Sequence, residues 1–282
     1  MKHSLYMRFP EGRAKALTFS YDDGVEQDIR LVDILDRHGM KGTFNINSGL
    51  YAPEGKVYPK GQVHRRMTEQ AITDLFKNSG HEVAVHAYSH PFLEKLSPAN
   101  VTWEIIKDRE CLEKQFGTVI RGMAYPYGTH SDSVVEVLRN CGIAYARTTV
   151  STERFNIPTD WLRMPATCHH NNPHLMELAD KFLAMSVPNL PQLFYLWGHS
   201  YEFEGNNNWH VIEEFTDRMA GKEDDIWYAT NIEIYEYIED YKSLIWSADG
   251  SIVKNPTART LWFRYSGANR SIAPGETLNL DF

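Results

Sequence analysis

Val83-Ala-Val-His86-Ala-Tyr-Ser-His90-Pro91 is a short apolar run that ends in two histidines and a proline. Its first residues are small or branched and apolar, which is typical of a buried β-strand. The histidines lie four positions apart directly after this run, and imidazole nitrogens are common ligands of zinc and related divalent metals. We therefore expect a strand that delivers metal ligands at its carboxyl end.

A second apolar run, Ala16–Tyr21, is followed by Asp22-Asp23-Gly24. Neighbouring side chains of an extended chain point in opposite directions, so the two carboxylates can do different jobs. Asp-Gly is also a common turn, and this segment alone leaves the turn interpretation open. Together with the two histidines, one carboxylate would hold a metal and leave positions open for water and substrate, as a hydrolytic site requires.

Two more polar segments follow predicted strands. Tyr125-Pro-Tyr-Gly128 comes after Ile120–Ala124, and Gly198-His199 comes after Leu193–Trp197. Apolar runs alternate with amphipathic stretches in about seven strand–helix pairs, which indicates parallel strands joined by helices, in either a barrel or an open doubly wound sheet. Because the strand ends of a parallel barrel share one mouth, which would gather all these groups, we favour the barrel.

The chain changes character after residue 242. Residues 1–242 are predicted to form the barrel, and residues 243–282 a small β-extension with strands at 251–254, 260–265 and 277–280. About forty residues are too few for an independent core, so we expect the extension to pack on the barrel. It could cover a sheet edge or lengthen a substrate groove, and the sequence leaves both open.

The overall composition excludes several classes of partner. The 282 residues are 42% hydrophobic, enough for one large domain, and the net charge of −8 argues against nucleic acid and acidic membranes. Three cysteines without Cys-x-x-Cys spacing argue against disulfides and thiolate metal sites. The first ten residues show no signal-peptide core and no later run is of membrane-spanning length, so we expect a cytoplasmic protein without a membrane partner. The oligomeric state stays undetermined.

Five segments, in order, resemble the motifs of the polysaccharide deacetylases (the NodB-homology domain, carbohydrate esterase family four). The likeness extends over about residues 15–240. The five segments are Ser20–Gly24, His86–Pro91, Tyr125–Gly128, Asp160-Trp161 and Trp197–His199.

The resemblance implies a distorted (β/α)7 TIM-like barrel that removes N-acetyl groups from amino sugars with the help of a divalent metal. In that family pattern Asp23, His86 and His90 would hold the metal. Asp22 would be the catalytic base, and His199 the catalytic acid.

The same resemblance implies roles around this centre. The backbone N–H of Tyr127 would help bind the oxyanion, and Asp160 would orient the acid histidine. Trp161 would form a wall of the cleft, and Tyr125 and Trp197 would also contact the substrate.

Three positions depart from the family pattern. Ala124 stands where the third motif has the arginine that pairs with the base, and Arg121 or Arg163 could substitute for it. Ile157 replaces the first aspartate of the fourth motif. Trp197 replaces the usual leucine beside the acid histidine, so the acyl pocket could differ in size.

The sequence thus predicts a metal-dependent N-deacetylase acting on an N-acetylated amino sugar or oligosaccharide. Its cofactor would be one divalent metal, zinc first, with cobalt, nickel or manganese as alternatives. Two other functions stay open. One is hydrolysis of a non-sugar C–N bond, in a ureide or cyclic amide, and the other is a metal-containing carbohydrate-binding protein without turnover.

Overall fold

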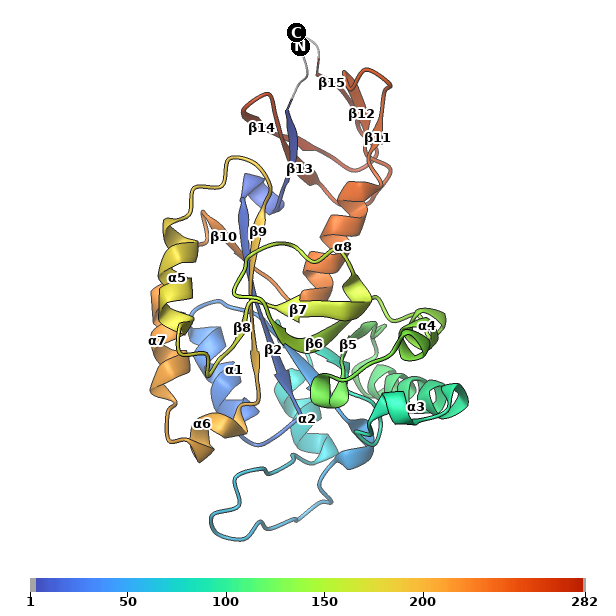
Figure 1. The fold of residues 1–282 in the computed structure, drawn as a ribbon, viewed down its shortest axis with the longest axis vertical. Coiled ribbons are helices and arrows are strands. Elements are labelled where there is room, and N and C mark those ends of the chain that lie inside the picture. The colour runs from blue at the N-terminus through green and yellow to red at the C-terminus, as the bar shows by residue number, and fades with distance from the viewer. Residues whose placement is uncertain (1–3, 281–282) are drawn as a thin grey trace.

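The computed structural model, which describes residues 4–280, is built around a nine-stranded sheet in which every ladder is parallel (Figure 1). The central strands are buried on both faces, as expected for parallel strands that helices cover. The strands of this sheet are β2 (Lys15–Asp22), β3 (Gly42–Ile46), β4 (Glu82–Val85), β5 (Gly122–Ala124), β6 (Tyr145–Ser151), β7 (Met164–Ala166), β8 (Cys168–His169), β9 (Gln192–Gly198) and β10 (Ile226–Tyr228).

Helices lie around the outside of these strands (Figure 1). Polar caps start several of them, since Thr68, Ser97 and Ser131 each accept a hydrogen bond from a backbone N–H of the first turn. No helix among residues 4–280 is both long and apolar enough to cross a bilayer. The helices are α1 (Asp28–Arg37), α2 (Glu69–Phe76), α3 (Pro98–Phe116), α4 (Asp132–Asn140), α5 (Leu175–Ala184), α6 (Tyr201–Gly205), α7 (His210–Met219) and α8 (Asn231–Lys242).

The sheet curls into a barrel that does not close as one continuous ladder. Its order is β7-β6-β5-β4-β3-β2-β9-β8, with β10 beside β2. The two end strands are consecutive in the chain, separated only by Thr167; β7 pairs with β6, and β8 pairs with β9. This interrupted segment brings the two edges of the sheet together. The fold confirms the predicted distorted, TIM-like (β/α) barrel.

Two small antiparallel sheets contain most of the C-terminal extension. The first has the order β1-β13-β14 and the second β11-β12-β15. Because β1 comes from the start of the chain, the first sheet joins both ends of the sequence, and the division at residue 242 stays a prediction. The strands are β1 (Leu5–Arg8), β11 (Ile245–Trp246), β12 (Ile252–Lys254), β13 (Leu261–Tyr265), β14 (Ala268–Ile272) and β15 (Thr277–Asn279).

The extension packs at the amino ends of the parallel strands. Arg8 in β1 is buried and donates hydrogen bonds to the carbonyls of Pro188 and Asn189, just before β9 begins. Tyr237 of α8 donates to the carbonyl of Arg8 and accepts from the N–H of Trp262 in β13. Figure 1 shows the extension at the end of the molecule opposite the long loop before α2. It therefore does not line the mouth at the carboxyl ends of the strands.

Candidate active site

The predicted chemical groups converge at the carboxyl ends of neighbouring strands. Asp22 is the last residue of β2, and Asp23 follows it. His86 comes directly after β4, and His199 directly after β9. Strand β2 pairs with β9 on one side and with β3 on the other, and β3 pairs with β4. Positions far apart in the sequence thus meet at one mouth, as the barrel prediction requires.

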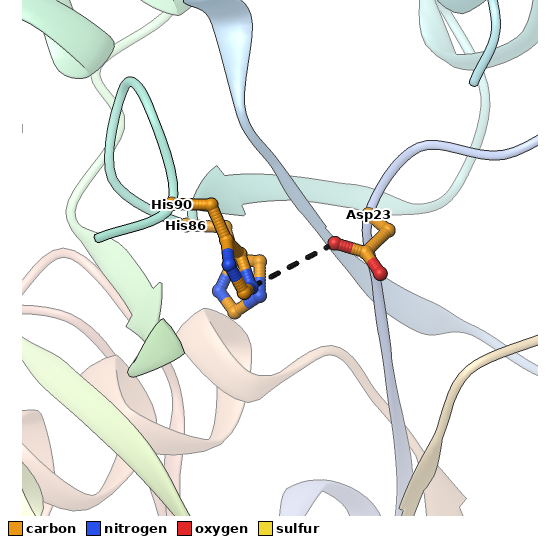
Figure 2. Close-up of side chains that lie close together, drawn as sticks. All are labelled: Asp23, His86 and His90. Atoms are coloured by element: carbon orange, nitrogen blue, oxygen red, sulfur yellow. Dashed lines mark ion pairs between the residues drawn. The ribbon is translucent and has the colours of Figure 1, made fainter. Parts of the chain in front are cut away.

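Asp23, His86 and His90 point toward one another across this mouth (Figure 2). Their ligand atoms all lie within 4.8 Å of one another, and His90 Nε2 is 3.9 Å from Asp23 Oδ1. Asp23 and His86 are buried, whereas His90 is partly exposed. One carboxylate oxygen and two imidazole nitrogens converging in this way fit a zinc-like divalent ion.

A backbone contact orients the His86 ring for ligation. His86 Nδ1 lies 2.8 Å from the carbonyl oxygen of Ala124, which can only accept, so this nitrogen carries the proton. The other nitrogen, Nε2, is then free to donate a lone pair toward the centre. Metal-bound histidines commonly have a carbonyl or carboxylate on the remote ring nitrogen. This hydrogen bond is therefore a second observation that fits a metal.

The loop that carries the two histidines has an unusual backbone. Ala87 and His90 have φ of 60° and 55°, a region that non-glycine residues rarely adopt and that costs about 1–3 kcal/mol each. The side-chain amide of Asn47 donates to the carbonyls of both His86 and Ala87, to the latter at 2.7 Å. The surrounding structure thus holds a backbone that the loop alone would not adopt.

Two acidic residues one turn apart on α3 hold the other side of this loop. The carboxylate of Asp108 accepts the N–H of His86 at 3.1 Å, and that of Glu104 accepts the N–H of Ser89 at 2.8 Å. Both acids are buried. Burial raises the pKa of Asp108 to about 7. The hydrogen bonds that its carboxylate accepts act in the opposite direction and lower the pKa.

The long loop at residues 51–67 reaches the Asp23 carboxylate. Arg66 Nη2 donates to Asp23 Oδ1 at 2.9 Å, and His64 Nε2 is 3.2 Å from Oδ2. Burial alone would raise the pKa of Asp23. The His64 hydrogen bond and the positive charge of Arg66 oppose burial, and the pKa of Asp23 is held well below its usual range. Asp23 is therefore ionised, as a metal ligand must be.

Asp22 is buried and paired with Arg147 of β6. Arg147 Nη2 donates to Asp22 Oδ1 at 2.6 Å and contacts Oδ2 as well, and the Asn45 amide donates to Oδ1 at 2.8 Å. Burial raises the pKa of Asp22, but the charge of Arg147 lowers it below its usual value overall. Asp22 thus has the arginine partner that Ala124 cannot supply, and this arginine comes from the strand next to β5.

The sequence analysis named two other arginines for this role, and neither contacts Asp22. Arg121 Nε donates to the carbonyl of Gly142, and Arg163 pairs with Asp160 and Asp132 near the surface. The signal that could have identified Arg147 is its position as the only charged residue of Tyr145–Thr148, a short run typical of a strand. A charged residue inside a buried strand needs a partner of opposite charge.

His199 lies between two carboxylates. Its Nε2 is 3.8 Å from Asp22 Oδ2, and its Nδ1 is 3.2 Å from Glu202 Oε1. Burial lowers the pKa of His199, but the hydrogen bond to Glu202 and the negative charge of Asp22 raise it above its usual value overall. An imidazole with a raised pKa holds its proton near neutral pH, as a general acid must.

Asp160 does not have the position predicted for it. Its carboxylate caps the short turn that follows, accepting the N–H of Leu162 at 3.1 Å and pairing with Arg163 at 2.8 Å. The carboxylate beside His199 is that of Glu202 instead. A local capping hydrogen bond satisfied Asp160 within its own segment, which explains why it is not at His199.

The predicted substrate contacts divide into two groups. Trp161 is buried in the core and packs edge-on against Tyr235, with ring centres 5.2 Å apart, and Tyr125 is buried and donates to the carbonyl of Leu162. Neither side chain is a cleft wall, because each is used in packing. Trp197 does lie at the centre, with its ring 4.4 Å from the guanidinium carbon of Arg147.

Tyr127 lies beside the metal ligands in a strained turn. Its φ is 59°, and its half-exposed ring lies 4.5 Å from that of His90 and stacks on Phe92 at 3.9 Å. The turn is therefore next to the predicted metal. The oxyanion role of its N–H stays a prediction.

Buried Asp28 at the start of α1 connects two loops of the site and should make stability depend on pH. It accepts from Ser200 Oγ at 2.6 Å and from the N–H of Val25 at 3.0 Å, and burial raises its pKa to about 7. Between about pH 4 and 7 the metal-free folded protein thus binds more protons than the unfolded chain, so its free energy of unfolding falls as pH rises. We expect this fall to be about 3 kcal/mol between pH 5 and pH 8 by urea unfolding, and we expect Asp28→Asn to abolish it.

The control for this prediction is Asp33→Asn, which changes an exposed aspartate on the same helix. Its stability relative to the parent should be the same at pH 5 and at pH 8. A parent and an Asp28→Asn variant that keep a constant difference across this range would show that Asp28 does not titrate there.

Comparison with known proteins identifies relatives for about half of the chain. The sequence model of the polysaccharide deacetylases matches residues 10–146, which include the three proposed ligands and Asp22 but neither Arg147 nor His199. A peptidoglycan-N-acetylglucosamine deacetylase of Listeria monocytogenes is 28% identical over 141 residues, 49% of this chain and 26% of the relative. A chitooligosaccharide deacetylase of Sinorhizobium fredii is 28% identical over 153 residues, 53% and 61% of the two chains.

The chain thus spans about a quarter and about three fifths of the length of these two relatives. Among solved structures, a putative polysaccharide deacetylase from Mycobacterium smegmatis superposes with a TM-score of 0.59 at 17% identity, covering 83% of this chain and 93% of the other. At this identity, the similarity establishes a common fold.

Proposed function

Through residues 10–146 this chain belongs to the polysaccharide deacetylase family, and on that premise we propose that it is a metal-dependent hydrolase that removes N-acetyl groups from an amino sugar or oligosaccharide. The observation that supports this most is the convergence of Asp23, His86 and His90 beside the buried pair of Asp22 and Arg147. A metal triad next to an ionised, unligated carboxylate is what activation of a water molecule requires.

The proposed cofactor is one divalent metal, zinc first, with cobalt, nickel or manganese as alternatives. Asp23, His86 and His90 would hold it. When bound, it would polarise the acetyl carbonyl and lower the pKa of water from about 15.7 toward 7.

Asp22 would act as the base. Arg147 contacts both of its oxygens and Asn45 donates to Oδ1, while Oδ2 is the oxygen nearer the centre, 3.9 Å from His86 Nε2 and 3.8 Å from His199 Nε2. In the proposed step, Oδ2 takes a proton from water while the water oxygen bonds to the acetyl carbon. The pairing with Arg147 keeps the carboxylate ionised, and the Asn45 amide holds Oδ1, which leaves Oδ2 toward the centre.

His199 would act as the acid. When the C–N bond breaks, its electron pair stays on the sugar nitrogen, which takes a proton from His199 Nε2. The products are acetic acid, which then loses its proton to solvent, and a free amine; the proton on Asp22 can return to His199, whose Nε2 is 3.8 Å away. The N–H of Tyr127 would donate to the oxyanion, and Trp197 would border the acyl pocket.

The structure also bears on the alternative that the chain is a metal-containing carbohydrate-binding protein without turnover. That hypothesis rested on the missing arginine at Ala124 and on Trp197, and for the first of these Arg147 pairs with Asp22 instead. Hydrolysis of a non-sugar C–N bond has no specific structural observation in its favour. We therefore propose the N-deacetylase alone.

We expect the metal-loaded protein to release acetate from N-acetylated chito-oligosaccharides or from peptidoglycan fragments. Removal of the metal by a chelator should reduce acetate release to background, and added Zn²⁺ or Co²⁺ should restore it, because unligated water is too weak a nucleophile for an amide. Acetate is measured with a coupled enzymatic assay, and metal content by elemental analysis.

His90→Ala is the matched control, since it should lose both metal and activity, whereas His174→Ala removes an exposed histidine outside the triad and should keep its metal. If the fully metallated parent releases no acetate from either class of substrate, the proposed function is wrong.

A further inference from the structure

Glu202, in the first turn of α6, lies among three histidines. Its Oε1 is 3.2 Å from His199 Nδ1. Its Oε2 is 2.9 Å from His170 Nε2 and 3.2 Å from His169 Nε2, and it accepts from the Asn171 amide at 3.3 Å. Apart from His199, no member of this group lies in a family motif. We call the four residues, Glu202, His169, His170 and His199, the Glu202 cluster.

The fold builds this cluster from two segments. His169 ends β8 and is paired in register with Trp197 of β9, so His169 and His170 lie beside the strand that leads to His199. His170 is fully buried and stacks on Phe203, with ring centres 4.1 Å apart. A Cβ at Gly198 would lie 2.0 Å from His170 Nδ1, so the chain needs glycine there to admit the ring.

A second metal site is the obvious alternative, because His169, His170 and Glu202 have ligand atoms within 4.8 Å of one another. The proton on His169 argues against it. His169 Nδ1 accepts the N–H of Asn171 at 3.1 Å, so in the neutral ring the proton is on Nε2. This is the nitrogen that faces Glu202, and it has no lone pair to offer a cation. The His169 N–H therefore faces the Glu202 carboxylate and not a metal ion.

We propose that Glu202 is the positioning residue of His199, supplying the contact that the family resemblance assigns to Asp160. A carboxylate on Nδ1 keeps the proton of the neutral ring there and turns Nε2 toward Asp22. His169 Nε2 and His170 Nε2 lie 3.2 Å and 2.9 Å from the other oxygen of Glu202, and this proximity restricts the carboxylate. This inference rests on the proposed function, because it assigns His199 the role of the acid.

The main competing explanation is that Glu202 only joins β8 to α6 as a structural ion cluster. The two explanations differ in how the effect depends on the leaving group. A sugar amine must be protonated to leave, whereas 4-nitrophenolate leaves without a proton. Loss of the positioning residue should therefore slow amide hydrolysis much more than hydrolysis of 4-nitrophenyl acetate, while structural damage should slow both.

The experiment compares Glu202→Gln with the parent, both metal-loaded, on N-acetylated chito-oligosaccharide and on 4-nitrophenyl acetate. We expect kcat for the amide to fall about 100-fold, the lower end of what general acid catalysis contributes, with KM little changed. The chelator-sensitive rate on 4-nitrophenyl acetate should stay within about threefold. Glu204→Gln is the matched control, because Glu204 lies on the same helix and pairs with Arg65 rather than with a histidine, so both rates should be unchanged.

Equal losses on the two substrates, or no loss on either, would overturn the proposal. A measurement on the unmutated protein makes the test independent of how the variant folds. Imidazole ¹⁵N NMR, with His199 assigned from a His199→Gln sample, should show the Nδ1–H tautomer in the neutral ring, and an Nε2–H tautomer would overturn the proposal.

The same data separate this inference from the proposed function. If the parent deacetylates sugars and Glu202→Gln keeps the full rate, only the role of Glu202 is wrong. If the parent has no deacetylase activity, the proposed function is wrong, and the role of Glu202 in positioning a catalytic acid is wrong with it.

Discussion

Replacing Arg147 by methionine is expected to lower the free energy of unfolding by about 3–5 kcal/mol at pH 7. The guanidinium is fully buried and contacts both oxygens of buried Asp22, so its removal leaves a carboxylate without a counter-charge and out of water. Methionine keeps much of the side-chain volume, which limits the contribution of a cavity. Urea unfolding followed by fluorescence measures the loss. A chelator is present so that bound metal does not stabilise the folded state.

The loss should grow as pH rises. In the parent, Arg147 holds the pKa of Asp22 below its unfolded value, so the pair adds stability above that value and loses it as pH falls through the folded pKa. In the variant, burial would raise the pKa, so stability is lost as pH rises. The difference between parent and variant should therefore be larger at pH 7 than at pH 4.

Two controls accompany this variant. The double variant Asp22→Asn with Arg147→Met should recover more than half of the loss, because no charge is left unpaired. Arg163→Met removes an arginine with only surface ion pairs and should cost within about 1 kcal/mol. A double variant as unstable as Arg147→Met would show that packing, rather than the charge on Asp22, causes the loss.

Asp22→Asn is expected to lower kcat for acetate release by about 10²–10⁴-fold while the metal stays bound. The amide cannot take a proton from water, yet Asp22 is outside the triad of Asp23, His86 and His90. Because Arg147 loses its partner, the variant will also be less stable, so rates are measured well below its unfolding temperature. Steady-state assays and elemental analysis of the same samples give activity and metal content.

The adjacent aspartate provides the comparison. Asp23→Asn should lose metal and activity together, because it removes a ligand. The contrast between two neighbouring positions separates base from ligand better than either variant alone. An Asp22→Asn enzyme with more than a tenth of the parent kcat would show that another group takes the proton.

The groups that sequence reasoning identified at the centre share one property. Asp22, His86 and His199 each stand at the end of a strand whose apolar pattern is clear in the sequence. In a parallel barrel such ends meet, so the strand pattern alone was enough to bring them together.

The groups that it missed act through partners distant in sequence or through local competition. Arg147 is 125 positions from Asp22, and its partner depends on which strand lies beside β5 and in what register. The carboxylate of Asp160 accepts a hydrogen bond from a backbone N–H two residues away, and it does not lie at His199. Trp161 matches a family motif, yet its ring is buried in the hydrophobic core.

Hydrophobic periodicity and strand ends are local properties, so the alternation of strands and helices, the barrel class and the side chains at its mouth follow from the residue pattern. The pairing of charges, Arg147 with Asp22 and Glu202 with His199, follows from the folded arrangement. Ion pairing depends on distances of a few ångströms between segments, and strand register and helix docking set those distances.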